Sequence, residues 1–352
     1  MKSIIELRTS PHIRKPHSVE KIMRNVVGAL LPLCAFAVYA FGLSALALIL
    51  VVTISCLLTE FIFSRLSGKG NTLGDWSAAI TGLLLALTLP PGFPLWMGFV
   101  AGFIAIALGK ALFGGLGLNV FNPALVGRAF VQVSFPAAAT TWTPAFSVDR
   151  FSTFIPTTFT LPLMSPPDIA LWTEKASVGL THDAYSGATA LAKMKFENVN
   201  TDSLDLFLGF HHGSLGETSA ALIFVCGLYL IFRRMMDWRI PAAILIGAFV
   251  LTEALTLFGS TVPGSFMLFS GGLMLGAMFM ATDMVGSPVT PVGIWLYGFL
   301  IALITVVIRL YGGQTEGVMY AILFANAAGP LIEELTQPRI FGAGSSVVDK
   351  NE

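Results

Sequence analysis

The sequence predicts an all-α polytopic membrane protein, with about ten transmembrane helices in two inverted five-helix repeats. Three observations support this fold class. The 352-residue chain is 55% hydrophobic and has a mean hydropathy of +0.79. Only 11% of its residues are charged, whereas soluble domains carry about 25%. Apolar runs of about 20 residues, the length that crosses a bilayer as a helix, recur along the whole chain.

Charge and motif content exclude several classes of function. The net charge is zero, so the chain has no basic field that would attract nucleic acid. We find no P-loop or zinc-like spacing. Cys34, Cys56 and Cys226 each stand alone in an apolar run, which is typical of small buried side chains and gives no iron–sulfur framework. No histidine lies inside an apolar run, which disfavours a membrane haem.

Ten segments are expected to be membrane spans. The first is too long for a signal-peptide core and no cleavage pattern follows it, so we expect it to be retained. In chain order the expected spans are 25–43, 44–63, 77–90, 94–112, 121–136, 217–232, 240–258, 266–284, 292–310 and 316–334. They divide the chain into an N-terminal arm (1–24), a first membrane repeat (25–136), a connecting loop (137–216), a second membrane repeat (217–334) and a C-terminal tail (335–352).

Lysine and arginine gather on one side of this topology. Such an excess marks the cytoplasmic face. The N-terminal arm carries six of these residues, and others follow at 65–69, at Lys110, at 233–239 and in the tail. With ten spans they share one face. Both termini are therefore predicted to be cytoplasmic, and the 137–216 loop lies on the outer side of the cell's inner membrane.

The two halves of the chain share an order of motifs. ITGLLLALTLPPGFP (80–94) is matched by SGGLMLGAMFMATDMVGSP (270–288), and LFGGLGLNVFNPALVG (112–127) by LYGGQTEGVMYAILFANAAGP (310–330). With five spans in each half, the second copy is inverted, as in many transport proteins. Chance similarity between helices rich in Gly, Ala and Leu is the alternative interpretation.

Two spans of the first half are expected to be discontinuous. Residues 77–89 are too few to cross and end at a Leu-Pro-Pro-Gly turn, while 121–136 begins with Asn122 and Pro123. Asn as N-cap followed by Pro is a helix-start pattern. Helix ends at membrane depth need surrounding protein or a cavity, and helix N-termini favour anions or electron-rich groups. A ligand or ion path and simple packing kinks are the two interpretations.

Polar side chains inside apolar spans are costly and are usually functional. Arg128 lies in NPALVGRAF and needs an acceptor, such as a ligand carbonyl, a carboxylate or a backbone carbonyl. Glu253 lies in the seventh expected span. Glu60, Asp75 and Asp283 lie near span ends, where solvated anchoring is the simpler interpretation, although ATDMVGSP around Asp283 is typical of a helix break.

The 137–216 loop is far longer than an ordinary connection. It contains DAYSGATALA, in which small residues flank Thr189, and we expect its hydroxyl to be accessible to another enzyme. Because threonine is a poor nucleophile without a base, modification is favoured over catalysis. A plain exposed turn is the alternative. The loop closes with HHGSLGETSA, where Glu217, Thr218 and Ser219 are expected to cap the next helix. The alternative is that this stretch helps to bind a ligand.

Over essentially its whole length the chain resembles the D subunit of Rnf complexes and the related B subunit of sodium-pumping NADH:quinone oxidoreductases. The resemblance rests on GLLLALTLPP, FGGLGLNVFNPALVGR, DAYSGAT, GSLGETS, ATDMV and YGGQTEGVMYAILFANA. It implies FMN attached by a phosphoester bond to Thr189 and installed from FAD by a flavin transferase outside the cytoplasm. The matching motif residues that precede Thr189 are Asp183, Ser186, Gly187 and Ala188. Glu217 and Thr218 are expected to help seat this FMN.

The resemblance also implies a second, non-covalent flavin, which is riboflavin in the quinone reductases, near the first broken helix. The matching residues are Asn119, Asn122, Pro123 and Arg128. We expect Arg128 to meet carbonyl oxygens of this second flavin, or else to tie down backbone carbonyls.

The short outer loop and N-terminal arm favour an Rnf D subunit over the quinone-reductase B subunit. An Rnf subunit would work beside a membrane pair of subunits, a flavinylated G-type subunit and cytoplasmic subunits that handle NADH and ferredoxin, in a complex that moves Na⁺ or H⁺. No GxGxxG follows a strand-like run, so NADH is expected to bind elsewhere. A channel or secondary transporter with the same inverted plan, and a scaffold subunit, are the competing hypotheses.

Overall fold

The computed structural model describes residues 18–68, 70, 72–162, 164, 167, 169, 172–173, 189–197, 201–209, 212–259 and 261–338. Every regular element in these residues is a helix. Five helices are long and apolar enough to cross a membrane, namely α1 (Val19–Phe41), α2 (Leu43–Leu66), α11 (Arg239–Thr256), α14 (Pro291–Tyr311) and α15 (Val318–Leu335). The prediction of an all-α integral membrane protein is confirmed.

Shorter helices occupy the remaining expected spans. Three are apolar, namely α3 (Ser77–Leu87), α10 (Ala220–Phe232) and Leu95–Ala111, which joins α4 (Leu95–Ile106) to the π-helical η2 (Ala107–Ala111). The eighth expected span is divided into α12 (Gly264–Phe269), α13 (Leu273–Leu275) and the π-helical η5 (Gly276–Met280). The other elements are α5 (Pro123–Ser134), α6 (Pro136–Ala139), η1 (Leu73–Asp75), η3 (Pro156–Phe159), α8 (Ala190–Ala192), the π-helical η4 (Lys193–Glu197) and α9 (Ser203–Leu208).

The start of α5 follows directly from its sequence. Asn122 is the N-cap, and its Oδ1 accepts a hydrogen bond from Ala124 N at 3.0 Å. Pro123 occupies the first turn, where its missing N–H costs nothing. The Asn-Pro helix start is therefore confirmed. It places the N-terminal end of α5 inside the helical body.

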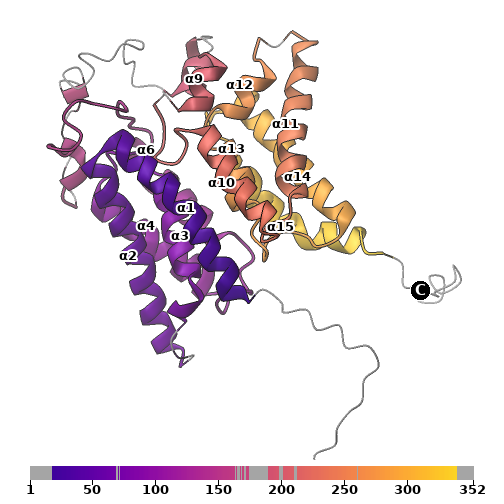
Figure 1. Cartoon of the computed structure of the whole chain (residues 1–352), viewed down its shortest axis with the longest axis horizontal. Coiled ribbons are helices and arrows are strands. Elements are labelled where there is room, and N and C mark those ends of the chain that lie inside the picture. Colours follow the sequence, from indigo (N-terminus) through magenta and orange to yellow (C-terminus); the bar gives the residue numbers. More distant parts are fainter. Residues whose placement is uncertain are drawn as a thin grey trace, which may run out of the picture.

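The two halves of the chain lie side by side and pack in similar ways (Figure 1). In the first half α2 packs against α3 and α4, and α4 packs against α5; in the second half α11 packs against α14, and α14 against α15. The halves meet where α10 contacts α1 and where α15 contacts α5. Figure 1 shows the start of α1 and the end of α15 at the lower edge of the body, and α6 and α9 at the upper edge.

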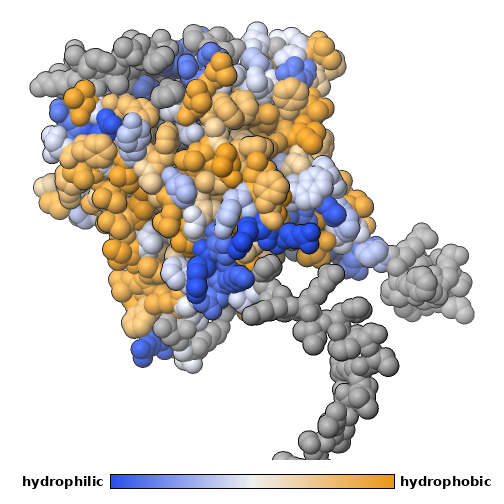
Figure 2. Space-filling view, viewed as in Figure 1, coloured by the Kyte–Doolittle hydropathy of each residue, from blue (hydrophilic) through white to orange (hydrophobic). Residues whose placement is uncertain are grey.

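The outer faces of the long helices are apolar. Figure 2 shows hydrophobic residues over the flanks of the body, with hydrophilic residues along its upper edge and in a patch toward its lower end. On α2 and α14 the exposed apolar side chains recur every three or four residues, so each forms a stripe along one helix face. These residues are Leu46, Leu50, Ile54 and Leu58 on α2, and Val292, Trp295, Phe299, Leu303 and Val307 on α14. Such stripes suit contact with lipid.

Candidate functional site

Thr189 lies at the start of α8 and is largely buried. Its exposed fraction is 9%, and its Oγ1 accepts a hydrogen bond from Ala192 N at 3.3 Å. The expectation of a freely accessible hydroxyl is therefore wrong for this structure, because the side chain caps a helical turn that packs onto the second half. Asp183, Ser186, Gly187 and Ala188 lie outside the described residues.

The segment that follows Thr189 is fixed to the second half of the chain. Lys195 Nζ donates hydrogen bonds to Ile308 O at 3.2 Å, to Gln314 O at 2.8 Å and to Gly312 O. A lysine at the carbonyl end of α14 is electrostatically favoured by the helix dipole. These bonds tie η4, and with it Thr189, to the end of α14.

The loop before α10 closes the open end of α3. Leu215 N donates to Leu89 O at 3.1 Å, and Gly216 N donates to Leu87 O at 2.7 Å. These bonds satisfy carbonyl groups that the short helix leaves without an intrahelical partner. The next two residues, Glu217 and Thr218, are buried. The GSLGETS motif thus supplies hydrogen-bond donors to the C-terminal end of α3 and places Glu217 beside it.

Four charged side chains, Arg128, Glu217, Arg309 and Glu316, gather where the two halves meet. Glu316 Oε1 accepts a hydrogen bond from Gly272 N at 2.9 Å. Both carboxylates act electrostatically on both arginines. Arg128, Glu217 and Glu316 line one cavity with Gly272 and Thr88, which we call the Arg128 cavity.

The two arginines of this cluster have different surroundings. Arg309 is fully buried, and its guanidinium donates to Met267 O at 2.8 Å and to Ser270 O at 3.0 Å, beside the C-terminal end of α12. Arg128 is also buried, but its Nη1 has no hydrogen-bond partner among the residues that the structure describes. Each arginine has one buried nitrogen without a partner among the described residues, Nε of Arg309 and Nη1 of Arg128, but only Arg128 lines the cavity.

Glu217 lies in the loop that precedes α10. Burial raises the pKa of its carboxyl to about 8, and the nearby Glu316 carboxylate acts in the same direction. Two like charges at one site disfavour ionisation of both. The cluster is thus able to hold a proton near neutral pH.

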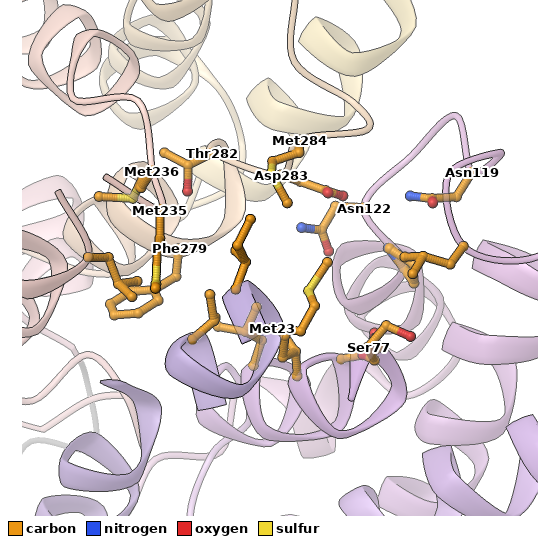
Figure 3. Close-up of a pocket in the computed structure, with 18 of the residues that line it drawn as sticks. Met23, Ser77, Asn119, Asn122, Met235, Met236, Phe279, Thr282, Asp283 and Met284 are labelled. Atoms are coloured by element: carbon orange, nitrogen blue, oxygen red, sulfur yellow. The ribbon is translucent and has the colours of Figure 1, made fainter. Parts of the chain in front are cut away.

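A second cavity, the Asn122 cavity, lies among α1, α3, the start of α5 and η5 (Figure 3). Its polar lining residues are Ser77, Thr81, Lys110, Asn119, Asn122, Thr282 and Asp283, and its walls are rich in methionine. Asn122 Nδ2 donates to Met280 O at 3.1 Å, which joins α5 to η5 of the other half. Figure 3 labels Asn122 and Asp283 among the side chains of this lining. The cavity offers amide and carboxylate groups within an apolar wall.

The structure therefore divides the predicted site residues into two groups. Asn119, Asn122 and Pro123 line the Asn122 cavity, whereas Arg128 lines the other cavity with Glu217. Arg309 and Glu316 were not among the residues predicted from the sequence. A charged residue inside or beside an apolar span is a signal of function, and both residues carry that signal.

Lys110 is buried in an ion pair and does not extend from a loop. Its Nζ lies 2.8 Å from Glu60 Oε1 and donates to Ser77 Oγ at 2.7 Å. Thr72 Oγ1 donates to the same Glu60 oxygen at 2.8 Å. The interpretation of Glu60 as a solvated anchor is wrong, because Lys110 neutralises it inside the helical body.

Comparison with known proteins gives a match over nearly the whole chain. The model of the NQR2, RnfD, RnfE family matches residues 6–342. The chain is 42% identical to the D subunit of the Na⁺-translocating ferredoxin:NAD⁺ oxidoreductase complex of Acetobacterium woodii, over 96% of this chain and 95% of that protein. It is 40% identical to the D subunit of the proton-translocating ferredoxin:NAD⁺ oxidoreductase complex of Clostridium ljungdahlii, over 97% of each. Identity to the D subunit of the ion-translocating oxidoreductase complex of Actinobacillus succinogenes is 36%, over 97% of this chain and 99% of that protein. The chain therefore belongs to the NQR2, RnfD, RnfE family.

Proposed function

We propose that this chain is the flavin-carrying membrane subunit of a complex that couples electron transfer between ferredoxin and NAD to movement of Na⁺ or H⁺ across the cell membrane. The observation that carries the proposal is the full-length similarity to D subunits of ferredoxin:NAD⁺ oxidoreductase complexes. Its partners would be the other Rnf-type subunits: a membrane pair, a flavinylated G-type subunit and the cytoplasmic subunits that handle NADH and ferredoxin.

FMN is proposed to be joined to Thr189 by a phosphoester bond. The surroundings of Thr189 fit such a group, because the segment is fixed beside a cluster with a free buried donor, Arg128 Nη1, and two carboxylates. When bound, FMN would supply one- and two-electron redox chemistry. The chain would hold and orient it, and Glu217 and Thr218 would lie on the side where the loop returns to α10.

Attachment requires access to a hydroxyl that is 9% exposed here. We propose that the flavin transferase acts when the turn at α8 opens. Only one capping hydrogen bond, at 3.3 Å, joins the Thr189 hydroxyl to this turn. An N-cap contributes about 1 kcal/mol, so opening this bond costs little.

A second, non-covalent flavin is proposed in the Asn122 cavity. Asn119, Asn122 and Pro123 would line it, and Asp283 would add an acceptor for its N–H or hydroxyl groups. The apolar walls with a few placed polar groups are typical of cofactor sites. The resemblance suggests riboflavin. Arg128 lines the other cavity, so we do not retain it for this flavin.

We also propose the inverted-repeat topology, with both termini cytoplasmic and residues 137–216 outside. Similar packing within each half supports two repeats of five spans. The start of α1 and the end of α15 share one edge of the body, opposite α6 and α9 (Figure 1). The excess of Lys and Arg near the termini supports a cytoplasmic position for that edge.

Two other functions are alternatives to this proposal. A B subunit of a sodium-pumping NADH:quinone oxidoreductase would carry the same flavin but pass electrons to quinone. A channel or secondary transporter would carry none. In-gel fluorescence of the denatured chain separates flavin carriers from transporters, because a covalent flavin survives denaturation. We expect fluorescence from wild type, none from Thr189→Ala, and ferredoxin-dependent NAD reduction by the purified complex. A dark wild-type band would refute the flavin assignment.

A further inference from the structure

We propose that the Arg128 cavity binds the imide edge of a flavin ring, with Arg128 as the hydrogen-bond donor and Glu217 and Glu316 as acceptors. This inference rests on the proposed attachment of FMN at Thr189 and names the groups that would hold its ring. It assigns Arg128 to the flavin at Thr189. It also gives a ligand-binding role to Glu316.

The unmet donor of Arg128 is the first observation. Its Nη1 is buried and makes no hydrogen bond to any residue that the structure describes. No ion pair joins it to a carboxylate within the same described residues, although Glu316 and Glu217 both act on it electrostatically. A buried charge is normally paired or hydrogen-bonded. A group that accepts from the guanidinium and lies between it and the carboxylates would complete the cluster.

The two carboxyl groups converge near Gly272, which also lines the cavity. A Cβ built on Gly272 would lie 2.9 Å from Glu217 Oε1 and 3.3 Å from Glu316 Oε2. The Gly272 N–H holds one oxygen of Glu316 and leaves the other oxygen free of that bond. The cavity therefore holds a guanidinium donor and carboxyl acceptors together.

This pattern selects a particular ligand chemistry. A simple anion such as phosphate would pair with Arg128 but would be repelled by the Glu316 carboxylate. The pyrimidine ring of a flavin carries two carbonyl oxygens and an N–H between them. A guanidinium donates to carbonyl oxygens, and a carboxylate accepts from the N–H. An imide edge thus provides a partner for the guanidinium donor and for a carboxyl acceptor at once.

The cavity adjoins the segment that carries Thr189. A Cβ built on Gly271, the neighbour of Gly272, would lie 2.6 Å from Leu191 Cδ1. Leu191 is two residues after Thr189, and Lys195 holds the next turn against the end of α14. The flexible ribityl arm of FMN allows the ring to enter the cavity while its phosphate stays on Thr189.

The test compares three variants of the full chain in its native complex. They are Arg128→Met, Glu316→Gln and the control Glu253→Gln. Glu253 also accepts a hydrogen bond from a glycine N–H, that of Gly264, at 2.8 Å, but lies in α11 and outside the cavity. The midpoint potential of the covalent flavin is measured by spectroelectrochemistry, and its attachment is checked by in-gel fluorescence.

Arg128→Met should lower the midpoint potential, because the reduced, more negative flavin loses a positive neighbour. Glu316→Gln should raise it, and Glu253→Gln should leave it unchanged. Unchanged potentials in the first two variants, with fluorescence retained, would overturn the placement of the ring and leave attachment at Thr189 intact. A dark wild-type chain would instead overturn the proposed function.

A measurement on the wild type covers the case in which a variant fails to fold. Riboflavin labelled with ¹³C at its two carbonyl carbons is supplied during expression, and subtracting the infrared spectrum of the Thr189→Ala complex from that of the wild type isolates the carbonyl bands of the flavin at Thr189. Hydrogen bonds from Arg128 should place these bands below those of flavin in an aprotic solvent. Bands at the aprotic position would overturn the proposal.

Discussion

Replacing Gly271 with alanine tests the packing that joins the Thr189 segment to the Arg128 cavity. Gly271 has a φ of +60°, and an L-residue in this left-handed conformation costs about 1–2 kcal/mol. The new Cβ would overlap the Glu316 carboxylate and lie 2.6 Å from Leu191 Cδ1. If Glu316 moves away, the Gly272 N–H loses its acceptor, and an unsatisfied buried donor costs about 1–3 kcal/mol. The expected loss is about 2–5 kcal/mol.

Gly68→Ala is the matched control for this change. Gly68 has a φ of +65°, and no atom would lie within 4 Å of its new Cβ among the described residues. It should therefore lose only the backbone contribution, about 1–2 kcal/mol. The assay is thermal unfolding of the purified complex in detergent, followed by tryptophan fluorescence. Equal losses in the two variants would refute the claim that Glu316 and Leu191 meet at Gly271.

Three further predictions concern other contacts. Lys195→Met removes three bonds to backbone carbonyls and should increase proteolysis of the loop around Thr189, whereas Lys195→Arg should retain most of the protection; equal cleavage of both would contradict the anchoring role. Lys110→Met leaves Glu60 as a buried unpaired charge and should cost about 3–5 kcal/mol, and the double change Lys110→Met/Glu60→Leu should recover most of that loss in the same unfolding assay. Asn122→Ala should reduce the flavin released by acid without reducing in-gel fluorescence, and a full complement of released flavin would argue against the second site.

Local sequence patterns predicted those parts of the fold that are decided by residues close together in the sequence. The apolar runs predicted helices, and Asn122 with Pro123 predicted where α5 begins, because capping is decided within one turn. The accessibility of Thr189 was not predictable in this way. Small flanking residues favour exposure, but Leu191 and Lys195 bury the segment through contacts with residues far along the chain.

The composition of the charged cluster also depends on distant contacts. Arg128 belongs to the first half, whereas Glu316 follows α14 in the second half, so only the packing of the two halves brings them to one cavity. Lys110 illustrates the same limit. Its place at the end of an apolar run gave no sign of a partner, and only the packing of helix α2 brings Glu60 within 2.8 Å of it.

The most direct test of the central claim is the mass of the peptide that contains Thr189. The purified wild-type chain is digested, and the fluorescent peptide is isolated and fragmented in a mass spectrometer. After trypsin cleavage at Lys175 and Lys193 we expect this peptide to span residues 176–193 and to carry the added mass of esterified FMN on Thr189, with no such peptide from Thr189→Ala. FMN mapped to another residue, or an unmodified Thr189 peptide as the sole form in the assembled complex, would contradict the attachment of flavin at Thr189.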